Sequence, residues 1–365
     1  MKKSFLLVLL GATMCCTAMA DKKPSKKPAA TTTKSQSAFT SGQEGLFGVL
    51  RRDADYFFDI PDSLLSRRFL ATVRFTSTPA GTGKYGGESV NQQTVYWEPA
   101  PGNVMLLRSD LMVNMGNPID AIDRAVKTSN NNPIIGTFKI EGHRNGHYLV
   151  KVTSFFNEDN PALGVGRDIK NKFGLQGYMP QASYIESIKT FALNTEIRTV
   201  KTWMTSTTST IAGSNTGRVT LGLNVSFVLL PKDPMIPRLF DPRVGYFTDT
   251  YYVFADNQQR SETMRFITRW RLEPKDSTDM EKMKRGELVE PKKPIVYYID
   301  PATPKKWRPY LIQGVNDWQK AFEHAGFKNA IMAKEWPVGC DSMSMEDARF
   351  SVIRYYASPI ENAYG

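Results

Sequence analysis

The chain has 365 residues, of which 41% are hydrophobic and 23% charged, a composition typical of a folded soluble protein. The net charge is +11, but the sequence contains no dense block of lysines and arginines, which argues against a nucleic-acid partner. Two of the three cysteines, Cys15 and Cys16, lie near the start of the chain. If that start is removed, Cys340 remains alone, no intramolecular disulfide can form, and we expect Cys340 to be a small buried apolar residue.

Residues 1–20 have the organisation of a secretory signal peptide. Lys2-Lys3 is a basic start, Phe5–Leu10 is an apolar run too short to cross a membrane, and Ala18-Met19-Ala20 is typical of a cleavage site. Ala12-Thr13-Met14 lacks the aliphatic and small residues that precede a lipid-modified cysteine, so we favour cleavage over lipidation. We therefore expect an exported protein, in the periplasm, the cell envelope or the medium, with no transmembrane segment after cleavage.

Residues 21–44 are rich in Lys, Pro and Thr and predict a flexible tether, because they contain almost no large apolar side chain. Short β-type runs broken by Gly, Pro, Asn and Asp follow, and they predict a mostly β region. We divide this region into an N-terminal β-rich domain (45–130) and a second β-rich domain (131–272), and a single β domain remains open. The expected strands are 68–76, 93–98, 103–108, 189–203, 244–254 and 262–272, and the expected helices are 118–127 and 161–173.

The alternation of side chains between residues 221 and 230 is the clearest strand pattern. Large apolar side chains occupy every second position, and up to residue 227 the positions between them are the small or polar Gly222, Asn224 and Ser226. This period of two predicts a strand with one buried and one exposed face. The apolar residues are Leu221, Leu223, Val225, Phe227 and Leu229.

Arg144-Asn145-Gly146 lies between two β-type runs and predicts a hairpin, because Asn-Gly suits the positive φ angles of a type I′ turn. His143 and His147 flank this turn. Their spacing is that of the two histidines in a zinc-binding H-E-x-x-H helix, but no glutamate follows His143 and Asn-Gly disfavours a helix. We therefore expect a solvated hairpin end rather than a metal site, and we expect His324 at the end of a helix.

Two other motifs carry no chemistry that the sequence supports. Residues 81–87 superficially resemble a phosphate-binding loop but lack its spacing, so we predict a mobile surface loop. Four aspartates between residues 53 and 62 lack the pattern of a calcium loop and are expected in turns. The motifs therefore give no candidate catalytic residue and no candidate metal ligand.

Beyond a charged linker at 273–293, residues 294–365 predict a separate α+β unit. Residues 294–299 are an expected strand. Apolar residues then recur at steps of three and four from Trp307 to Ala325, which predicts one amphipathic helix that stops at Gly326. The segments 330–333 and 349–356 are expected to add two further strands.

Several stretches of this chain together resemble one family, the exported bacterial zinc-dependent metallopeptidases. In that family, N-terminal domains of unknown function precede a metzincin-like catalytic domain. The resemblance extends from about residue 45 to the last residue. It is carried by FDIPDSLLSRRFL (58–70), GGESVNQQ (86–93), PRLFDPRVGYF (237–247), RWRLE (269–273), KKPIVYYID (292–300), WRPYLIQGVNDWQKAFEHAGF (307–327) and DARFSVIRY (347–355).

The resemblance implies a fold class: a mostly β N-terminal region of one or two β domains, then the incomplete first half of an α+β metzincin-like domain at 294–365. In such enzymes a later H-E-x-x-H-x-x-G-x-x-H motif supplies three zinc ligands and a general base. This sequence does not contain that motif. We therefore expect an N-terminal fragment that binds no zinc and is inactive alone, with no catalytic or metal residue of its own.

For the full-length enzyme, the resemblance implies zinc, a peptide or protein substrate, and hydrolysis of peptide bonds by zinc-activated water. Within this chain it implies only scaffold roles in the peptidase domain. The tryptophans and the phenylalanine of the helix are expected in its core, and the last strand is expected as framework close to the cleft. The scaffold residues are Trp307, Trp318, Phe322, Arg349 and Tyr356.

Two alternatives remain open. The chain would be a non-catalytic exported binding module for glycan or protein if exposed aromatic side chains of the β region bind the ligand. It would be a prosegment that inhibits or assists the peptidase if proteolysis separates it within residues 273–293.

Overall fold

The computed structural model describes residues 39–111, 113–205 and 211–357. β-Strands predominate in this part, so the prediction of a mostly β N-terminal region is confirmed. Within these ranges, no helix has both the length and the apolar character needed to cross a membrane. The predicted signal peptide and most of the predicted tether lie outside the described residues. The predicted end of the tether at residue 44 is wrong, since residues 40–43 form a strand.

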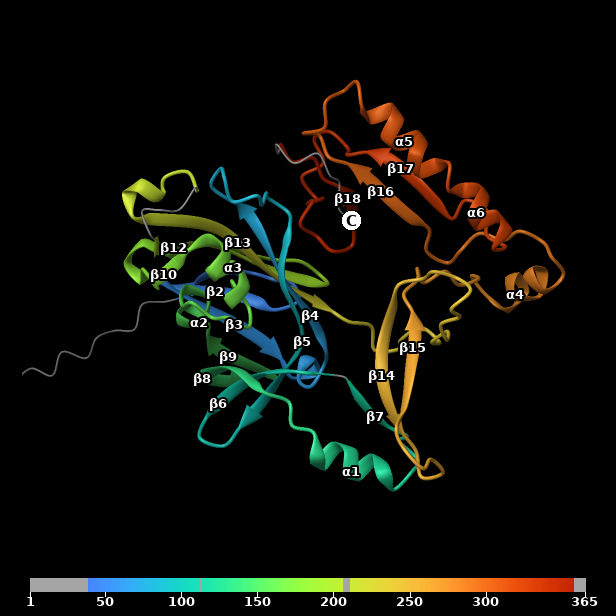
Figure 1. The fold of residues 1–365 in the computed structure, drawn as a ribbon, viewed down its shortest axis with the longest axis horizontal. Coiled ribbons are helices and arrows are strands. Elements are labelled where there is room, and N and C mark those ends of the chain that lie inside the picture. Colours follow the sequence, from blue (N-terminus) through green and yellow to red (C-terminus); the bar gives the residue numbers. More distant parts are fainter. Residues whose placement is uncertain (1–38, 112, 206–210, 358–365) are drawn as a thin grey trace, which may run out of the picture. The chain divides into compact units, whose positions relative to one another are not determined.

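One twelve-stranded sheet, paired antiparallel throughout, contains most of the strands (Figure 1). Its order is β1-β2-β3-β9-β8-β6-β5-β4-β13-β12-β10, with β11 also paired to β12. The strands are β1 (Thr40–Gln43), β2 (Gly48–Arg52), β3 (Asp55–Pro61), β4 (Phe69–Ser77), β5 (Ser89–Ala100), β6 (Val104–Ser109), β8 (Ile134–Arg144), β9 (His147–Lys151), β10 (Leu175–Tyr178), β11 (Tyr184–Thr190), β12 (Asn194–Thr205) and β13 (Arg218–Leu229).

Short helices lie in the connections of this sheet. They are the 3-10 turns η1 (Asp62–Leu64), η2 (Pro180–Ala182) and η3 (Ser214–Thr216), and the α-helices α2 (Thr153–Asn157) and α3 (Arg167–Phe173). The last of these confirms the second half of the helix expected at 161–173. The strand expected at 189–203 is instead a hairpin, in which β11 and β12 pair antiparallel.

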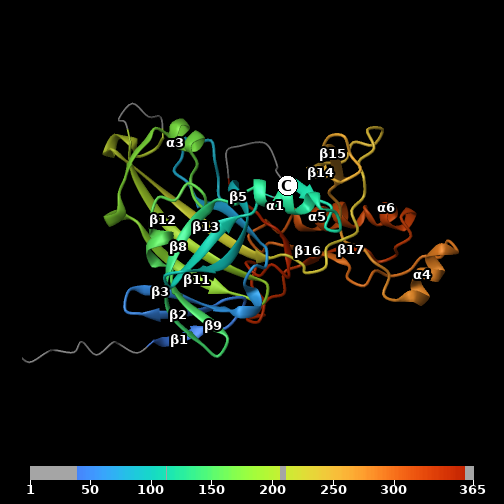
Figure 2. The same ribbon diagram turned by 90° about the horizontal axis from the view of Figure 1, so that it is seen from below.

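The boundary predicted between residues 130 and 131 does not separate two sheets. β8 pairs with β6, β9 pairs with β3, and β13 pairs with β4, so strands from both predicted domains alternate in one sheet. Figure 2 shows β1, β2, β3 and β9 following one another at one end of it. The sequence could not show this, because pairing between distant strands depends on contacts that local patterns do not encode.

The predicted hairpin is confirmed. β8 and β9 pair antiparallel with Arg144 opposite His147. Asn145 has φ 54° and Gly146 has φ 76°, the two positive values that a type I′ turn requires.

A cluster of aromatic side chains forms the main core of the sheet. The ring of Phe47, which is fully buried just before β2, lies 5.2 Å from the ring of Phe58 and 6.1 Å from those of Trp97 and Phe227. These edge and offset contacts add to the burial of large apolar surfaces. The core therefore joins the β2-β3 end of the sheet to β5 and β13.

A small mixed sheet and two helices lie outside the large sheet and the C-terminal unit. β7 and α1 come from the connection between β6 and β8, whereas β14, β15 and α4 follow β13 in the sequence. β14 pairs antiparallel with β15 and parallel with β7. The predicted linker contains a helix, α4, whose N-cap Asp276 accepts a hydrogen bond from the Asp279 N–H at 2.9 Å. The elements are β7 (Asn114–Gly116), α1 (Ile122–Ser129), β14 (Thr248–Phe254), β15 (Glu262–Ile267) and α4 (Ser277–Lys284).

The C-terminal unit is a three-stranded parallel sheet with two helices. Its order is β17-β16-β18, and α5 and α6 lie between β16 and β17 in the sequence and pack on β17 (Figure 1, orange to red). The predicted order of strand, helix, strand and strand is present, but the one helix expected between Trp307 and Ala325 is divided into α5 and α6 at residues 317–318. Gly326, with φ 94°, follows the last helix. The elements are β16 (Ile295–Ile299), α5 (Arg308–Asn316), α6 (Gln319–His324), β17 (Ile331–Glu335) and β18 (Ser351–Ile353).

The prediction that Trp307 and Trp318 pack in the core is wrong, because their side chains are 49% and 63% exposed. The half-buried positions of the two helices are 308, 311, 312, 315, 319 and 322. Each tryptophan precedes such a position by one residue, a rotation of about 100° around the helix. Phe322 is half-buried and packs against a small cluster that contains Phe327 and Ala330.

Two side chains of these helices cover the outer edge of β17. Asn316 Oδ1 accepts a hydrogen bond from the Ala333 N–H at 3.0 Å, and Gln319 Oε1 accepts one from the Ile331 N–H at 3.4 Å. Unpaired N–H groups at a sheet edge attract further strands. The amides of Asn316 and Gln319 therefore close this edge.

We expect Trp97→Ala to destabilise the protein by about 3–5 kcal/mol, because it leaves a cavity in the aromatic core. Trp307→Ala is the matched control and should change the free energy of unfolding by less than about 1 kcal/mol, since its side chain is half exposed. Urea denaturation of the two variants measures both values. Equal losses would contradict the burial described here.

Candidate functional site

The register of the large sheet aligns polar residues in two rows across one of its faces. Lys189, Glu196 and Ser226 are direct partners on β11, β12 and β13. In the neighbouring row, Arg198 lies opposite Asn224, and Asn224 lies opposite Arg74 of β4. Cross-strand partners point to the same face, so these side chains are held together. We call them the polar face: Arg74, Lys189, Asn194, Glu196, Arg198, Asn224 and Ser226.

The polar face corrects the prediction for β13. Leu221, Leu223, Val225 and Phe227 are buried as expected, but the intervening positions 222, 224 and 226 are buried too. β13 is therefore buried on both faces rather than half exposed. Polar side chains tolerate such burial when they are hydrogen-bonded.

Glu196 is the centre of the polar face and its side chain is only 3% exposed. Its carboxylate accepts hydrogen bonds from Asn194 Nδ2 at 2.6 Å and Asn224 Nδ2 at 2.5 Å. The hydroxyl of Ser226 also donates to it, and Arg74 Nη2 lies at 3.2 Å. A buried carboxylate is costly unless such donors surround it. The four donors therefore explain why the charge is tolerated here.

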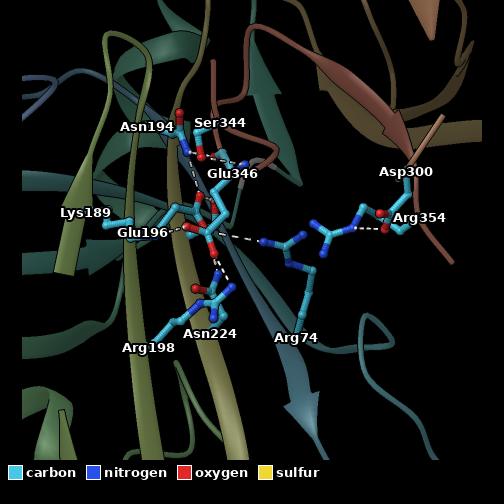
Figure 3. A network of polar contacts seen from close by, with 11 residues as sticks. Arg74, Lys189, Asn194, Glu196, Arg198, Asn224, Asp300, Ser344, Glu346 and Arg354 are labelled. Atoms are coloured by element: carbon cyan, nitrogen blue, oxygen red, sulfur yellow. Dashed lines mark hydrogen bonds and ion pairs between the residues drawn. The ribbon is translucent and has the colours of Figure 1, made fainter. Parts of the chain in front are cut away.

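A turn from the C-terminal unit covers the polar face (Figure 3). The Glu346 carboxylate pairs with the guanidinium of Arg198, and its other oxygen lies 3.1 Å from Lys189 Nζ. Asn194 Nδ2 donates to the Glu346 carbonyl at 2.7 Å, and Asn194 Oδ1 accepts from the Ala348 N–H at 2.9 Å. The sheet thus contacts both the side chain and the backbone of the turn.

The turn is also held by its own side chains. The Glu346 N–H donates to Ser344 Oγ at 3.2 Å, and the Arg349 N–H donates to Asp347 Oδ1 at 3.0 Å. The Arg349 guanidinium donates to both Asp347 oxygens, from Nε to Oδ1 at 3.1 Å and from Nη2 to Oδ2 at 2.6 Å. Burial alone would raise the pKa of the Asp347 carboxyl, but these bonds from Arg349 outweigh it and lower the pKa. We call residues 344–350 the acidic turn.

The residues after the acidic turn make a second contact with the large sheet. Arg354 Nε lies 3.0 Å from Asp300 Oδ2, at the end of β16. Tyr356 packs against Gly86 and Gly87 in the loop between β4 and β5. Gly87 has φ 89°, and a Cβ atom there would lie 2.6 Å from Cζ of Tyr356. This loop, predicted to be a mobile surface loop, therefore forms a seat for the Tyr356 ring.

We expect Gly87→Ala to lower the melting temperature more than Gly83→Ala. Both glycines have positive φ, 89° and 67°, so both alanines are strained by about 1–2 kcal/mol. Only the alanine at 87 also meets Tyr356, whereas nothing lies within 4 Å of a Cβ at 83. The added Tyr356→Ala change should remove the difference. Equal melting temperatures for the two single variants would show that Tyr356 does not occupy this seat.

Lys201 lies on β12, on the opposite side from the polar face, and is almost fully buried. Its ammonium donates to the carbonyl of Glu158 and lies 5.9 Å from the ring centre of Tyr178. Burial lowers the pKa of Lys201 to about 8, and the nearby Asp159 carboxylate opposes this only in part. Asp159 also accepts from Trp203 Nε1 at 3.2 Å. This group anchors residues 158–159 to the sheet.

The lowered pKa of Lys201 predicts that stability rises with pH. Between pH 8 and 10.5, the unfolded chain holds this proton more tightly than the folded chain, so raising the pH favours folding. The free energy of unfolding should gain about 2 kcal/mol from this residue between about pH 7 and about pH 9.5. Lys201→Met should lack that gain in urea denaturation at the two pH values. If both proteins show the same pH dependence, the pKa of Lys201 is not lowered in the folded chain.

The two histidines of the β8-β9 hairpin contact carboxylates of different residues. His143 Nε2 lies 3.0 Å from Asp62, and His147 Nδ1 lies 3.1 Å from Asp59, so each contacts a different aspartate. His324 is exposed at the end of α6. Among the described residues, no group of three or more histidine, cysteine, aspartate or glutamate side chains is arranged to hold a metal ion.

A cavity of about 310 Å³ lies at the carboxyl ends of β16 and β17 and contains the free Cys340. The prediction of a buried cysteine is wrong, because Cys340 is partly exposed and its sulfur lies 3.3 Å from Ser342 Oγ. Arg308, which also lines the cavity, is engaged by Glu335 at 3.0 Å and by two carbonyl groups. The cavity therefore offers no unengaged guanidinium to a ligand.

Of the predicted scaffold residues, the structure brings Arg349 and Tyr356 to the junction with the large sheet. Trp307 directly precedes α5, Trp318 lies between α5 and α6, and Phe322 lies on α6. Sequence reasoning missed Glu196, Asn194 and Glu346. A partial signal was present, because polar residues interrupt two strongly β-type segments, but the acidic turn that covers them is about 150 residues away.

Two family models match this chain. Residues 87–275, just over half of the chain, match "Domain of unknown function (DUF5117)". Residues 26–78 match "Domain of unknown function (DUF5118)". No curated protein and no solved structure matches the chain.

Proposed function

We propose that this chain, which belongs to the family of the domain of unknown function DUF5117, is the non-catalytic N-terminal portion of an exported zinc-dependent metallopeptidase. The proposal has two parts. The C-terminal unit is the first part of the peptidase domain, and the large sheet holds that unit in position.

The observation that supports the first part is the organisation of residues 294–357. A strand, two helices in line, and two further strands follow one another, which is the order in which a metzincin-like domain begins. The three strands are parallel and β16 lies in the middle. Parallel strands joined by a helix are usually covered on both faces. The exposed aromatic side chains on this unit agree with packing against further structure.

The contacts of the acidic turn support the second part. Glu346 and Ala348 contact Asn194 and Arg198, and Tyr356 contacts the loop between β4 and β5. All these contacts lie near β18, the edge strand of the parallel sheet. The large sheet would therefore set the position of β18 in the enzyme. Within the part of the chain that the structure describes, no cluster of histidine, cysteine or carboxylate side chains fits zinc.

We expect this 365-residue chain to bind no stoichiometric zinc and to cleave no peptide, whereas the product of the whole reading frame does both. The reason is that the chain lacks the H-E-x-x-H-x-x-G-x-x-H motif, which supplies the three zinc-binding imidazoles and the glutamate that such chemistry needs. Metal analysis by mass spectrometry and cleavage of unstructured casein measure the two properties. Stoichiometric zinc and cleavage by the short chain would overturn the proposal.

One observation, the exposure of aromatic side chains, supports the alternative of a binding module. The large aromatic side chains of the twelve-stranded sheet, such as Trp97 and Trp203, are mainly buried, whereas Trp307, Tyr310 and Trp318 are exposed on α5 and α6. A binding role would therefore involve the helices rather than the large sheet. It would be favoured if the product of the whole reading frame also lacks zinc.

A further inference from the structure

The acidic turn contacts the polar face in the way that a bound peptide contacts its receptor. Its own shape is maintained by bonds from Ser344, Asp347 and Arg349 within the turn. Its contacts with the sheet use one side chain, Glu346, and two backbone groups on either side of Asp347. Receptors commonly bind a peptide in this way: opposite charges bind one of its side chains, and polar groups bind its backbone N–H and C=O groups.

The charges of the polar face favour a carboxylate in this position. Lys189 and Arg198 face the acidic turn, while the only described carboxylate of the polar face, Glu196, is already engaged by four donors. Removal of Glu346 would leave both cations without their partner. Their side chains are 49% and 38% exposed, so water can hydrate them, and the face favours an anion through charge complementarity rather than through a cost of burial.

Two buried atoms of the polar face are not satisfied by the acidic turn. Arg198 Nε, a donor, and Asn224 Oδ1, an acceptor, have no hydrogen-bond partner among the described residues. Arg198 and Asn224 are direct partners on β12 and β13, so these atoms belong to one place in the face. Orphan polar atoms of this kind mark a contact that is not optimised.

We propose that the polar face of β11, β12 and β13 is a receptor for an acidic segment of a protein, and that the acidic turn occupies it in cis. The occupant has a glutamate whose carboxylate meets Arg198 and Lys189, and a backbone carbonyl and N–H that meet Asn194. A phosphate group would not satisfy the Asn194 amide in this way and would approach the Glu196 carboxylate. The chemistry therefore favours a protein ligand over a nucleic acid.

The connection within one chain explains why the cis occupant dominates. A tethered ligand has an effective concentration in the millimolar range, so a free segment competes only when the turn is weakened. A partner whose acidic segment binds the polar face more tightly would displace the acidic turn. It would also release the contact of Tyr356 with the loop between β4 and β5. The inference concerns the large sheet alone and does not require zinc or peptidase activity.

The test uses the full chain with Glu346→Lys, which places a cation against Arg198 and Lys189 and should expel the turn. The probe is a fluorescent peptide with the sequence of residues 341–351, DSMSMEDARFS, and a second peptide in which its glutamate is glutamine. Fluorescence anisotropy should show at least about tenfold tighter binding of the first peptide to the variant than to the wild-type chain. The glutamine peptide should bind the variant at least about tenfold more weakly.

Three further variants separate this proposal from general effects of charge or unfolding. Glu335→Lys makes the same charge change at a carboxylate paired with Arg308 and should bind no better than wild type. Arg198→Ala added to Glu346→Lys should abolish binding. Glu346→Gln keeps the shape of the side chain and should increase the affinity for the peptide by less than Glu346→Lys. It replaces Glu346→Lys in the experiment if the lysine variant does not fold.

The proposal is overturned if neither Glu346 variant binds the peptide better than wild type, or if the glutamate and glutamine peptides bind equally. It is also overturned if Glu335→Lys gives the same gain. Zinc content and casein cleavage play no part in these measurements, so this proposal and the proposed function can fail separately.

Discussion

The buried carboxyl group of one side chain in the large sheet is the constraint on which the surrounding structure depends. Glu196 lies in β12 with its carboxylate removed from water, and a charge in that position needs donors on every side. Asn194, Asn224 and Ser226 supply them from the same strand and the next one, and Arg74 from the strand beyond. β13 is then buried on both faces: one meets the aromatic core and the other meets amides and hydroxyls.

The C-terminal unit completes this arrangement. Asn194 has a double role, since its amide contacts Glu196 and also both backbone groups of the acidic turn. The interior of the sheet and the position of the turn are therefore linked through one fully buried side chain. Such polar contacts specify position more than they add stability, because their gain is offset by the loss of hydration.

Local patterns predicted the elements better than their assembly. Asn145-Gly146 encodes its own turn, and the alternation from Leu221 to Phe227 encodes a strand, because both signals lie within a few residues. The pairing of Asn224 with Arg198 and Arg74 depends on the register of three strands distant in sequence. The helix of the C-terminal unit shows the limit of periodicity, because a shift of one residue places Trp307 and Trp318 in solvent. The acidic turn could not be found from the sequence, since neither the turn nor the polar face has a local pattern that predicts their contact.

The position of the free thiol has a practical consequence. Cys340 is the free cysteine of the described residues and is partly exposed, only six residues before Glu346. In a chain without the first 20 residues, which contain Cys15 and Cys16, a spectroscopic label would attach to this sulfur alone, six residues before Glu346. Its polarity-dependent emission would register each departure of the turn from the sheet, so the native molecule carries its own attachment point for a reporter of that movement.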